Sequence, residues 1–297
     1  MVTSAGDPRC KPIVKWAGGK SRLLPELREQ LPKKIATYAE PFSGGAALFF
    51  ALASEPKKRR FERAVLVDRN EDLIACYRAV RDQVEDVIDA LAAYRYEAEM
   101  YYATRELDPT KMGDVERGAR FLFLNRTCYN GLWRVNSRGR FNVPFGRYKN
   151  PRIVRKEELR AASIALQATE LAVGDFTAGT KSLGKGDFVY FDPPYAPVSS
   201  TADFTAYAAG GFSQEDQERL VEELRRLRKA GAKAMLSNAD TEETRLLYRE
   251  FSVNVVYCSR SINSDPDKRG DTTELLVTSW GPAGVHKPEP RARARAS

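Results

Sequence analysis

The segment YFDPPY, Tyr190–Tyr195, places one carboxylate and two prolines beside an aromatic ring at the end of an apolar run. The apolar residues predict a buried strand that ends at Asp192. Pro193 and Pro194 restrict the backbone and supply no N–H donors, so carbonyl acceptors are left facing a ligand. A carboxylate next to a carbonyl suits a substrate with two N–H donors, such as an exocyclic amino group, and Tyr195 offers a ring on which a flat base can stack. The flanking strand and ring favour this interpretation over a purely structural turn.

Acids also end three other predicted strands. The strand at 35–40 ends at Glu40 and continues into the glycine turn PFSGG, the strand at 63–67 is followed by Asp68, and the strand at 169–173 is followed by GDF, which contains Asp175 and Phe176. In a doubly wound sheet, ligands bind beyond the carboxyl ends of the strands, so these residues predict one pocket. The GxGxxG spacing of dinucleotide sites is absent, which argues against an NAD-dependent oxidoreductase. The pattern predicts a nucleoside-containing cofactor without a pyrophosphate.

The segment KWAGGK, Lys15–Lys20, is a second glycine loop, and its GGKS ending suggests a phosphate-binding P-loop. That signature requires a glycine at position 14, where this chain has Val14. Gly18 and Gly19 instead allow the backbone to approach a ligand closely.

Alternating strands and helices predict an α/β protein with a parallel sheet to position these residues. Further strands are predicted at 187–191, 233–237, 253–258 and 273–280, with helices at 70–81, 214–230 and 242–251, the second of these capped by Ser213 and Asp216. Between about 82 and 160 the pattern changes to helical stretches and a basic, aromatic segment whose NG and RG pairs favour a β-hairpin. We interpret this region as an inserted module. The final KPEPRARARAS lacks apolar residues and predicts disorder.

The composition excludes several classes of protein. One histidine, His286, in 297 residues removes the usual general base and the commonest metal ligand, so no Ser-His-Asp site and no metal site are expected. The four cysteines show no CxxC spacing, which predicts reduced thiols. No apolar stretch reaches the ~20 residues of a membrane span, and no apolar signal core begins the chain, so a cytoplasmic location is expected. A net charge of +8 favours a polyanionic partner without identifying it.

In chain order, KWAGGK, EPFSGGAALF, VLVDRNEDL, LNRTCYNGLWRVNSRGRFNVPFGRY, GDF and FDPPY resemble the Dam-type (alpha group, D12 class) DNA adenine-N6 methyltransferases. The resemblance continues through FTAYAAGGFSQEDQERL and MLSNAD and covers nearly all of the chain except the termini. It implies a Rossmann-like methyltransferase sheet, residues 10–82 and 160–281. A mainly helical target-recognition domain carrying the hairpin, residues 83–159, would be inserted in it, and residues 282–297 would form a disordered basic tail.

The resemblance implies S-adenosylmethionine as methyl donor. Asp68 would hold the ribose hydroxyls, and Asp175 with Phe176 would recognise the adenine of the cofactor. The residues that match the family's cofactor-binding set are Lys15, Trp16, Ala17, Gly18, Gly19, Lys20, Glu40, Pro41, Phe42, Ser43, Gly44, Gly45, Asp68, Asp175 and Phe176. The catalytic set would be Asp192, Pro193, Pro194 and Tyr195.

The resemblance also implies that a target adenine is flipped out of double-stranded DNA into the pocket. Arg134 would contact O6 and N7 of a guanine. The residues that match the family's base-reading and neighbouring DNA-binding positions are Lys15, Asn130, Leu132, Arg134, Asn136, Arg138, Pro144 and Tyr148. This pattern favours the site GATC, and a longer site beginning with GAT is an alternative.

The sequence leaves two other functions open. One is a methyltransferase for RNA or for protein glutamine, although relatives with those substrates carry Asn where this chain has Asp192. Another is a DNA-binding relative that has lost catalysis, against which the intact acid and the cofactor glycines argue. The expected enzyme is a monomer, and a place in a restriction-modification system is possible.

Overall fold

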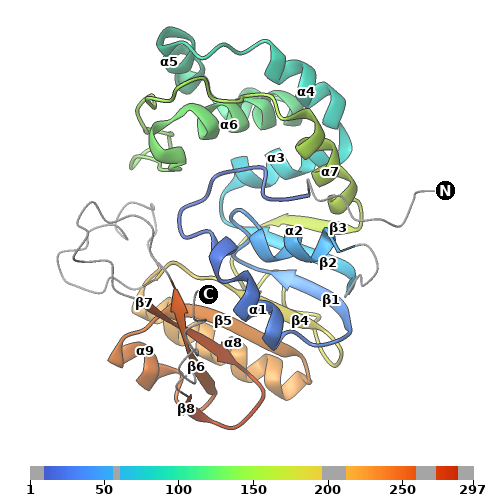
Figure 1. Ribbon diagram of the computed structural model, residues 1–297, viewed down its shortest axis with the longest axis vertical. Coiled ribbons are helices and arrows are strands. Elements are labelled where there is room, and N and C mark those ends of the chain that lie inside the picture. The colour runs from blue at the N-terminus through green and yellow to red at the C-terminus, as the bar shows by residue number, and fades with distance from the viewer. Residues whose placement is uncertain (1–9, 56–60, 196–211, 259–271, 287–297) are drawn as a thin grey trace, which may run out of the picture.

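The computed structural model describes residues 10–55, 61–195, 212–258 and 272–286, and its centre is a sheet (Figure 1). Within those residues the sheet has eight strands in the order β3-β2-β1-β4-β5-β7-β6-β8. Neighbouring strands from β3 to β5 are parallel, whereas β7 is antiparallel to both β5 and β6. The expected α/β fold is thus confirmed. The strands are β1 (Ile35–Glu40), β2 (Phe61–Asp68), β3 (Thr169–Val173), β4 (Phe188–Phe191), β5 (Lys233–Ala239), β6 (Ser252–Cys258), β7 (Thr272–Thr278) and β8 (Gly284–His286).

The parallel strands bring the predicted acids to one edge of the sheet. Glu40 is the last residue of β1, and Asp68 is the last residue of β2, in register with Val173 at the end of β3. Asp192 follows β4 directly, and Asp175 follows β3 by two residues. Because parallel strands all end at the same edge, these four carboxyl groups share one side of the molecule.

Some helices pack on the sheet, and α4, α5, α6 and α7 form a further helical layer, which lies at the top of Figure 1. Ser213 and Asp216 form the expected capping box of α8, and Gly231, at φ +81, ends that helix. Among the described helices, none combines the length and the apolar character needed to cross a bilayer. The helices are α1 (Leu24–Gln30), α2 (Ala47–Ala53), α3 (Glu71–Asp82), α4 (Val84–Ala92), α5 (Ala98–Glu106), α6 (Asp114–Thr127), α7 (Lys156–Leu166), α8 (Gln214–Ala230) and α9 (Glu242–Leu247), with 3₁₀ turns η1 (Lys20–Arg22), η2 (Pro109–Lys111) and η3 (Tyr129–Gly131).

Two hydrophobic cores lie on the two faces of the sheet, and β4 separates them. Phe188 and Tyr190 belong to one core, whereas Val189 and Phe191 belong to the other, as alternation along a strand requires. The second core contains the apolar face of α8. Both faces of β4 are therefore covered, which explains why that strand is apolar throughout.

The core that contains Phe188 continues into the helical layer, where it includes Leu91 of α4, Phe123 of α6 and Leu159 of α7. The boundary expected between residues 159 and 160 falls inside α7. The helical layer and the sheet thus share one core. The division into a catalytic domain, residues 10–82 and 160–281, and a target-recognition domain, residues 83–159, stays a prediction.

The segment predicted to form a hairpin folds back on itself through isolated antiparallel bridges rather than regular strands. These bridges join Cys128 to Phe145 and Val135 to Phe141. Gly139 of the RG pair has φ +72 and forms the tip of the turn. The NG pair, Asn130 and Gly131, is not part of this turn. It lies in η3, where the chain turns directly after α6.

Most predicted elements differ from the observed ones by one or two residues at an end, and two differences are larger. Gly284–His286 form β8, which pairs with β6, although residues 282–297 were expected to be disordered. That expectation is wrong for β8, because backbone hydrogen bonds to an open sheet edge do not need apolar side chains. Residues 287–297 lie outside the described part of the chain. The helix predicted to reach residue 251 ends at Leu247, because Tyr248 leaves the helical conformation and is buried.

Candidate active site and DNA-recognition surface

Asp192 receives polar contacts from two other elements. Lys20 of η1 places Nζ 2.8 Å from Oδ1 of Asp192, and the hydroxyl of Ser237 in β5 donates to the same oxygen at 3.0 Å. The hydroxyl of Tyr190 lies 2.9 Å from Oγ of Ser237. Because the serine proton is already donated to Asp192, Tyr190 donates to the serine. A chain of hydrogen bonds thus leads from the core to this carboxylate.

Burial raises the pKa of Asp192, while the charge of Lys20 and the hydrogen bonds from Lys20 and Ser237 oppose that rise. The net direction is upward. The side chain of Asp192 is 23% exposed and that of Lys20 is 8% exposed. Asp192 can therefore be reached by a ligand, whereas its cation is enclosed by protein.

Tyr195 lies beside the same cation. Nζ of Lys20 is 4.6 Å from the centroid of the Tyr195 ring, and the Tyr195 hydroxyl donates to Glu274 of β7 at 2.8 Å. Pro193 is buried and Pro194 is exposed. The structure thus adds Lys20 and Glu274 to the surroundings of the four predicted catalytic residues.

The glycine turn between β1 and α2 is tied to the end of β2. Asp68 accepts hydrogen bonds from the N–H of Gly44 through Oδ2 and from the N–H of Asn70 through Oδ1, each at 2.9 Å. The N–H of Ser43 donates to the carbonyl of Val67 at 2.9 Å. Burial raises the pKa of Asp68, and the backbone hydrogen bonds oppose the rise. The turn is consequently fixed against the strand whose acid is expected to hold the ribose.

The indole of Trp16 joins the two glycine segments. A Cβ on Gly44, which has φ +43, would lie 2.6 Å from Cδ1 of Trp16, and one on Gly45 would lie 3.3 Å from Cβ of Trp16. The N–H of Gly19 donates to the carbonyl of Trp16 at 3.2 Å. The KWAGGK loop therefore packs on the PFSGG turn, as a single pocket requires.

Glu40 faces the interior. It is 3% exposed, and its Oε1 accepts hydrogen bonds from the N–H of Phe49 at 2.7 Å and from the hydroxyl of Tyr38. Burial raises the pKa of Glu40 to about 8, although both hydrogen bonds oppose the rise. Burial thus favours the neutral form of Glu40, which supports the β1–α2 junction, and its direct contact with a cofactor stays a prediction.

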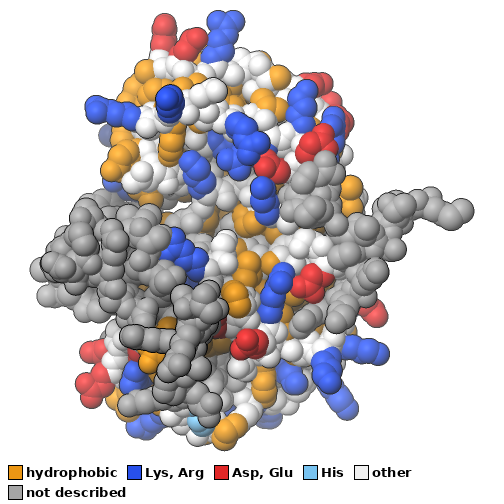
Figure 2. Space-filling model, in the orientation of Figure 1, with side chains coloured by type: hydrophobic (Ala, Val, Ile, Leu, Met, Phe, Trp, Pro, Cys, Tyr) orange, Lys and Arg blue, Asp and Glu red, His pale blue; other side chains and the backbone are white. Residues whose placement is uncertain are grey.

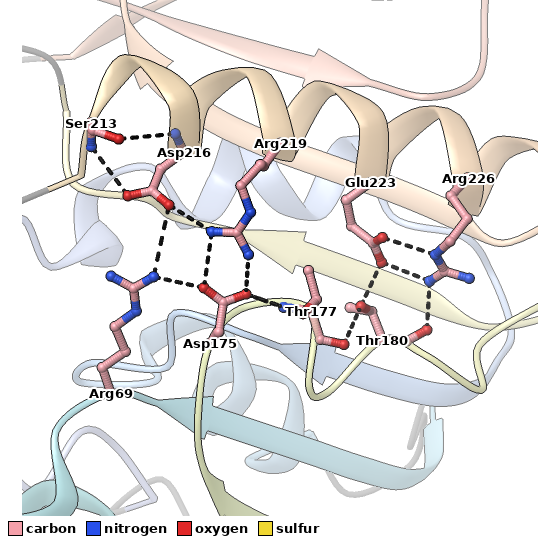
Figure 3. Close-up of polar contacts among 9 residues, drawn as sticks. All are labelled: Arg69, Asp175, Thr177, Thr180, Ser213, Asp216, Arg219, Glu223 and Arg226. Carbon is pink, nitrogen blue, oxygen red and sulfur yellow. Dashed lines mark hydrogen bonds and ion pairs between the residues drawn. The ribbon is translucent and has the colours of Figure 1, made fainter.

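Asp175 is held by two arginines (Figure 3). Its Oδ2 lies 2.6 Å from Nη2 of Arg69, and its Oδ1 lies 3.0 Å from Nη2 of Arg219 in α8. The N–H and the hydroxyl of Thr177 also donate to Oδ1, each at 3.1 Å. Burial raises the pKa of Asp175, but these hydrogen bonds outweigh it and hold the pKa at about 2. Asp175 is consequently a fixed anion at neutral pH.

Phe176 lies in an aromatic cluster next to this carboxylate. Its ring is 1% exposed, nearly parallel to that of Phe42 at 5.5 Å between centroids, and edge-on to that of Phe212 at 6.1 Å. The guanidinium carbon of Arg219 lies 4.9 Å from its centroid. Both members of the expected adenine-recognition pair therefore contact Arg219.

Lys15 connects the KWAGGK loop to the recognition segment. The buried side-chain amide of Asn125 in α6 accepts from the N–H of Lys15 and donates to its carbonyl, both at 2.8 Å. Nζ of Lys15 lies 4.2 Å from the centroid of the Tyr148 ring. A Cβ on Gly131, which has φ +65, would lie 2.4 Å from Cδ of Lys15, so glycine is needed after Asn130. The structure thus brings these predicted DNA-binding residues together.

Arg134 and Asn136 have partners inside the hairpin. Nε of Arg134 donates to Oδ1 of Asn142 at 2.8 Å. Oδ1 of Asn136 accepts from the N–H groups of Arg138 and Arg140 at 3.0 and 3.1 Å, so this side chain shapes the turn. Direct contact of Asn136 with DNA stays a prediction.

The rest of the recognition set lies on the surface. Asn130, Arg138 and Pro144 are exposed, and Leu132 and Tyr148 are half-buried. Figure 2 shows Lys and Arg side chains gathered over the helical layer. Because positive charge binds phosphates, this surface is a candidate DNA interface.

Metal ligands do not gather anywhere in the described part of the chain, where no group of three or more His, Cys, Asp or Glu could hold an ion. Cys10, Cys76 and Cys128 are free thiols in the core.

Three residues near the site have contacts that the sequence analysis did not assign. Lys20 was placed in the cofactor loop, but it contacts Asp192. Ser237 could have been found, because β5 lies beside β4 in parallel and their carboxyl ends must be neighbours. Asn125 contacts Lys15 across 110 residues of sequence, and no local sequence pattern predicts such a contact.

The mostly parallel sheet agrees with the Rossmann-like methyltransferase fold expected from the sequence. Residues 16–262 match the family described as D12 class N6 adenine-specific DNA methyltransferase. The chain is 42% identical over 279 residues to the Type II methyltransferase M1.LlaDCHI of Lactococcus lactis subsp. cremoris, with 91% of this chain and 96% of that protein covered. It is 38% identical over 269 residues to the DNA adenine methylase of Salmonella typhi, with 89% and 94% covered.

The chain therefore belongs to the D12 class of N6 adenine-specific DNA methyltransferases. It is an adenine-specific DNA methyltransferase, and its cofactor is S-adenosylmethionine. Among solved structures, the rRNA methyltransferase aviRa of Streptomyces viridochromogenes aligns over 93% of this chain and 92% of its own, with a TM-score of 0.35 and 11% identity.

The residues of the glycine turn fit S-adenosylmethionine. The hydroxyl of Ser43 is buried and, within the described residues, has no hydrogen-bond partner. A buried polar group without a partner is costly, and a charged group of a bound cofactor at this turn would satisfy it. The carboxylates of Asp68 and Asp175 are acceptors of the kind that ribose hydroxyls and an adenine amino group need.

Proposed function

We propose that this enzyme transfers the methyl group of S-adenosylmethionine to N6 of an adenine flipped out of duplex DNA, within the sequence GATC. The observation that carries the proposal is the group at the end of β4, where Asp192 is held by Lys20 and Ser237 beside the ring of Tyr195. An adenine inside a duplex cannot bring N6 to a half-buried carboxylate. The base must therefore leave the stack, at a cost of a few kcal/mol that the pocket has to recover.

Asp192 and the carbonyl of Pro193 would accept the two N6 hydrogens while Tyr195 stacks on the base. Fixing both hydrogens turns the nitrogen lone pair out of conjugation with the ring and toward the incoming carbon. The bound cofactor supplies an electrophilic methyl group on a sulfonium centre. As the N–C bond forms, the S–C bond would break and leave a neutral thioether, and the Asp192 carboxylate would stabilise the positive charge that develops at N6. N6 would then lose one of its two protons, through the Asp192 acceptor to solvent, which leaves the neutral methylamino group. Lys20 with Ser237 keeps the carboxylate in place.

We assign the cofactor pocket to the two glycine segments, Lys15–Lys20 and Glu40–Gly45, together with Asp68, Asp175 and Phe176. The packing of Trp16 on the PFSGG turn supports this, because it joins segments that are distant in sequence. Asp68 would hold the ribose, and the GDF pair would hold the adenine of the cofactor.

Recognition of GATC is assigned to Lys15, Asn130, Leu132, Arg134, Asn136, Arg138, Pro144 and Tyr148. Arg134, already positioned by Asn142, would contact a guanine in the major groove, a pair worth roughly 1–3 kcal/mol of discrimination. The contact between Lys15 and Asn125 supports a link between reading of the site and placement of the cofactor loop.

Methylation of a mixed-sequence DNA with labelled S-adenosylmethionine, followed by mapping of the modified bases, tests this proposal. Label on adenine in every GATC and nowhere else is the expected result. Label confined to a subset of GAT sites would show a longer recognition sequence. Label on cytosine, or cofactor binding without transfer, would contradict the proposed reaction. Arg134→Ala should relax discrimination at one guanine, whereas Lys149→Ala, a control at an exposed cation, should weaken all sites equally.

We further propose that the enzyme acts as a monomer in the cytoplasm, with or without a partner endonuclease of a restriction-modification system. A sedimentation coefficient that corresponds to 33.3 kDa would support the monomer.

A further inference from the structure

Arg219 makes, within the protein, the two contacts that the proposed function gives to the adenine of the cofactor. Its guanidinium donates to Asp175 (Figure 3). It also lies over the ring of Phe176. A guanidinium is planar and carries several N–H donors at its edge, as the amino side of an adenine does. The side chain comes from α8, an element that no sequence motif connected to the cofactor.

The acceptor positions of Asp175 are filled by protein donors. Oδ1 accepts from Arg219 and twice from Thr177, and Oδ2 accepts from Arg69 at 2.6 Å and, more weakly, from Nη1 of Arg219 at 3.5 Å. Two carboxylate oxygens offer about four acceptor positions. An adenine amino group must therefore replace one of these donors, and Arg219 is the donor that also covers Phe176.

Arg219 has a second acidic partner, Asp216, with which it can stay paired when it leaves Asp175. Its Nη1 lies 2.7 Å from Oδ1 of Asp216, three residues earlier in α8, and Asp216 is fixed by the capping box with Ser213. Release from Asp175 would therefore not leave the guanidinium without a counter-charge. Arg69 would remain on Asp175 and keep the carboxylate in position.

We propose that Arg219 is an internal substitute for the cofactor's adenine, which closes the adenine end of the pocket and is displaced when the cofactor binds. The inference rests on the proposed assignment of Asp175 and Phe176 to that adenine. Its consequence is that Arg219 competes with the cofactor, so the apparent dissociation constant is the intrinsic one divided by the fraction of molecules in which Arg219 has moved away.

The test is calorimetric binding of S-adenosylhomocysteine to the full-length protein and its variants. Arg219→Met keeps the length of the side chain and removes its charge and donors. We expect it to bind the nucleoside about 3- to 10-fold more tightly, because a half-exposed ion pair and a cation–π contact are each modest. Arg219→Lys should gain less, since an ammonium keeps the charge but loses the planar fork.

The chain offers a matched control on the same helix. Arg225 pairs with Glu222, also three residues earlier, and with Glu250, and neither pair involves Asp175 or Phe176. Arg225→Met should leave the affinity within about 2-fold of that of the unaltered protein, because an exposed ion pair away from the ligand contributes little.

Unchanged or weaker binding by Arg219→Met, with Asp175→Ala still strongly impaired, would overturn the substitution while leaving the pocket assignment intact. If Asp175→Ala bound as tightly as the unaltered protein, the pocket assignment itself would be wrong. Should Arg219→Met fail to fold, Arg219→Lys decides the question by the same criterion.

Discussion

Two strand-end carboxylates, Asp192 after β4 and Asp175 after β3, are held by cations in opposite ways. Asp192 has Lys20 beside it, with a side chain that is 8% exposed, whereas Asp175 has Arg69 and Arg219, which are 50% and 48% exposed. Burial raises the pKa of Asp192 despite its lysine. For Asp175 the hydrogen bonds from arginine and threonine outweigh burial, and the pKa falls to about 2.

The comparison shows that position on the sheet does not set the role of an acid. Both residues occupy the site that a parallel sheet offers to ligands. In the proposed function, the carboxylate with one cation would act in the reaction, because its charge is not neutralised by several donors. The carboxylate bonded to two guanidiniums would be a constant anion suited to recognition. The four predictions below test that division.

Asp192→Ala should have the largest effect. Loss of the acceptor at N6 should lower kcat by about 100- to 1,000-fold, as for removal of one preorganised polar group. Asp175→Ala should instead raise KM for S-adenosylmethionine and change kcat by less than about 3-fold, since uniform binding is lost. Steady-state kinetics of both variants on a GATC duplex measures the split. Equal losses of kcat in the two variants would remove the division between chemistry and recognition.

Lys20→Met should lower kcat by about 10- to 100-fold, because the positioning of Asp192 and a charge beside Tyr195 are lost together. Lys20 lowers the pKa of Asp192, so its removal should raise that pKa further. Since the reaction needs the carboxylate form, the acid limb of the pH–rate profile should move to higher pH. Lys34→Met, at an exposed lysine, serves as the control. An unmoved acid limb would show that Lys20 does not act through Asp192.

Much of the sheet follows from its sequence, because its signals are local. The strands at 35–40 and 169–173 and the helix at 214–230 have the predicted bounds, since apolar runs end at acids and Ser213 with Asp216 marks a helix start. The convergence of Glu40, Asp68, Asp175 and Asp192 follows from the parallel order alone.

The environment of each acid could not be predicted, because it depends on contacts between distant segments. Lys20 reaches Asp192 across the sheet edge, and Arg219 reaches Asp175 from a helix 44 residues later. The inward orientation of Glu40 is set by Tyr38 and by the N–H of Phe49, and a pattern of residue types does not encode such an orientation.

Ser237→Ala should have an intermediate effect. It removes one of the hydrogen bonds to Asp192 and leaves the hydroxyl of Tyr190 without its acceptor. Because Lys20 still holds the carboxylate, we expect kcat to fall about 5- to 10-fold with little change in KM, a loss of the size of one ordinary hydrogen bond. Ser237→Thr, which keeps a hydroxyl, should recover part of the rate. A change confined to KM would place Ser237 in binding instead.

Glu40→Gln should have the smallest effect on the reaction, with kcat within about 2-fold, because an amide can replace a neutral carboxyl group as acceptor for Tyr38 and Phe49. Its effect belongs to stability. Burial raises the folded-state pKa of Glu40 from an ordinary 4.5 to about 8. The neutral form is therefore favoured by folding, and this contribution is complete below pH 4.5 and lost as pH rises through about 8.

The unaltered protein should consequently lose thermal stability between pH 6 and pH 9 more steeply than Glu40→Gln does. Unfolding temperatures of the two proteins across that range provide the measurement, with Glu215→Gln at an exposed site as the control. Parallel curves would mean that Glu40 is ionised in the folded protein. Glu40 would then support the β1–α2 junction as a buried anion held by the hydroxyl of Tyr38 and the N–H of Phe49.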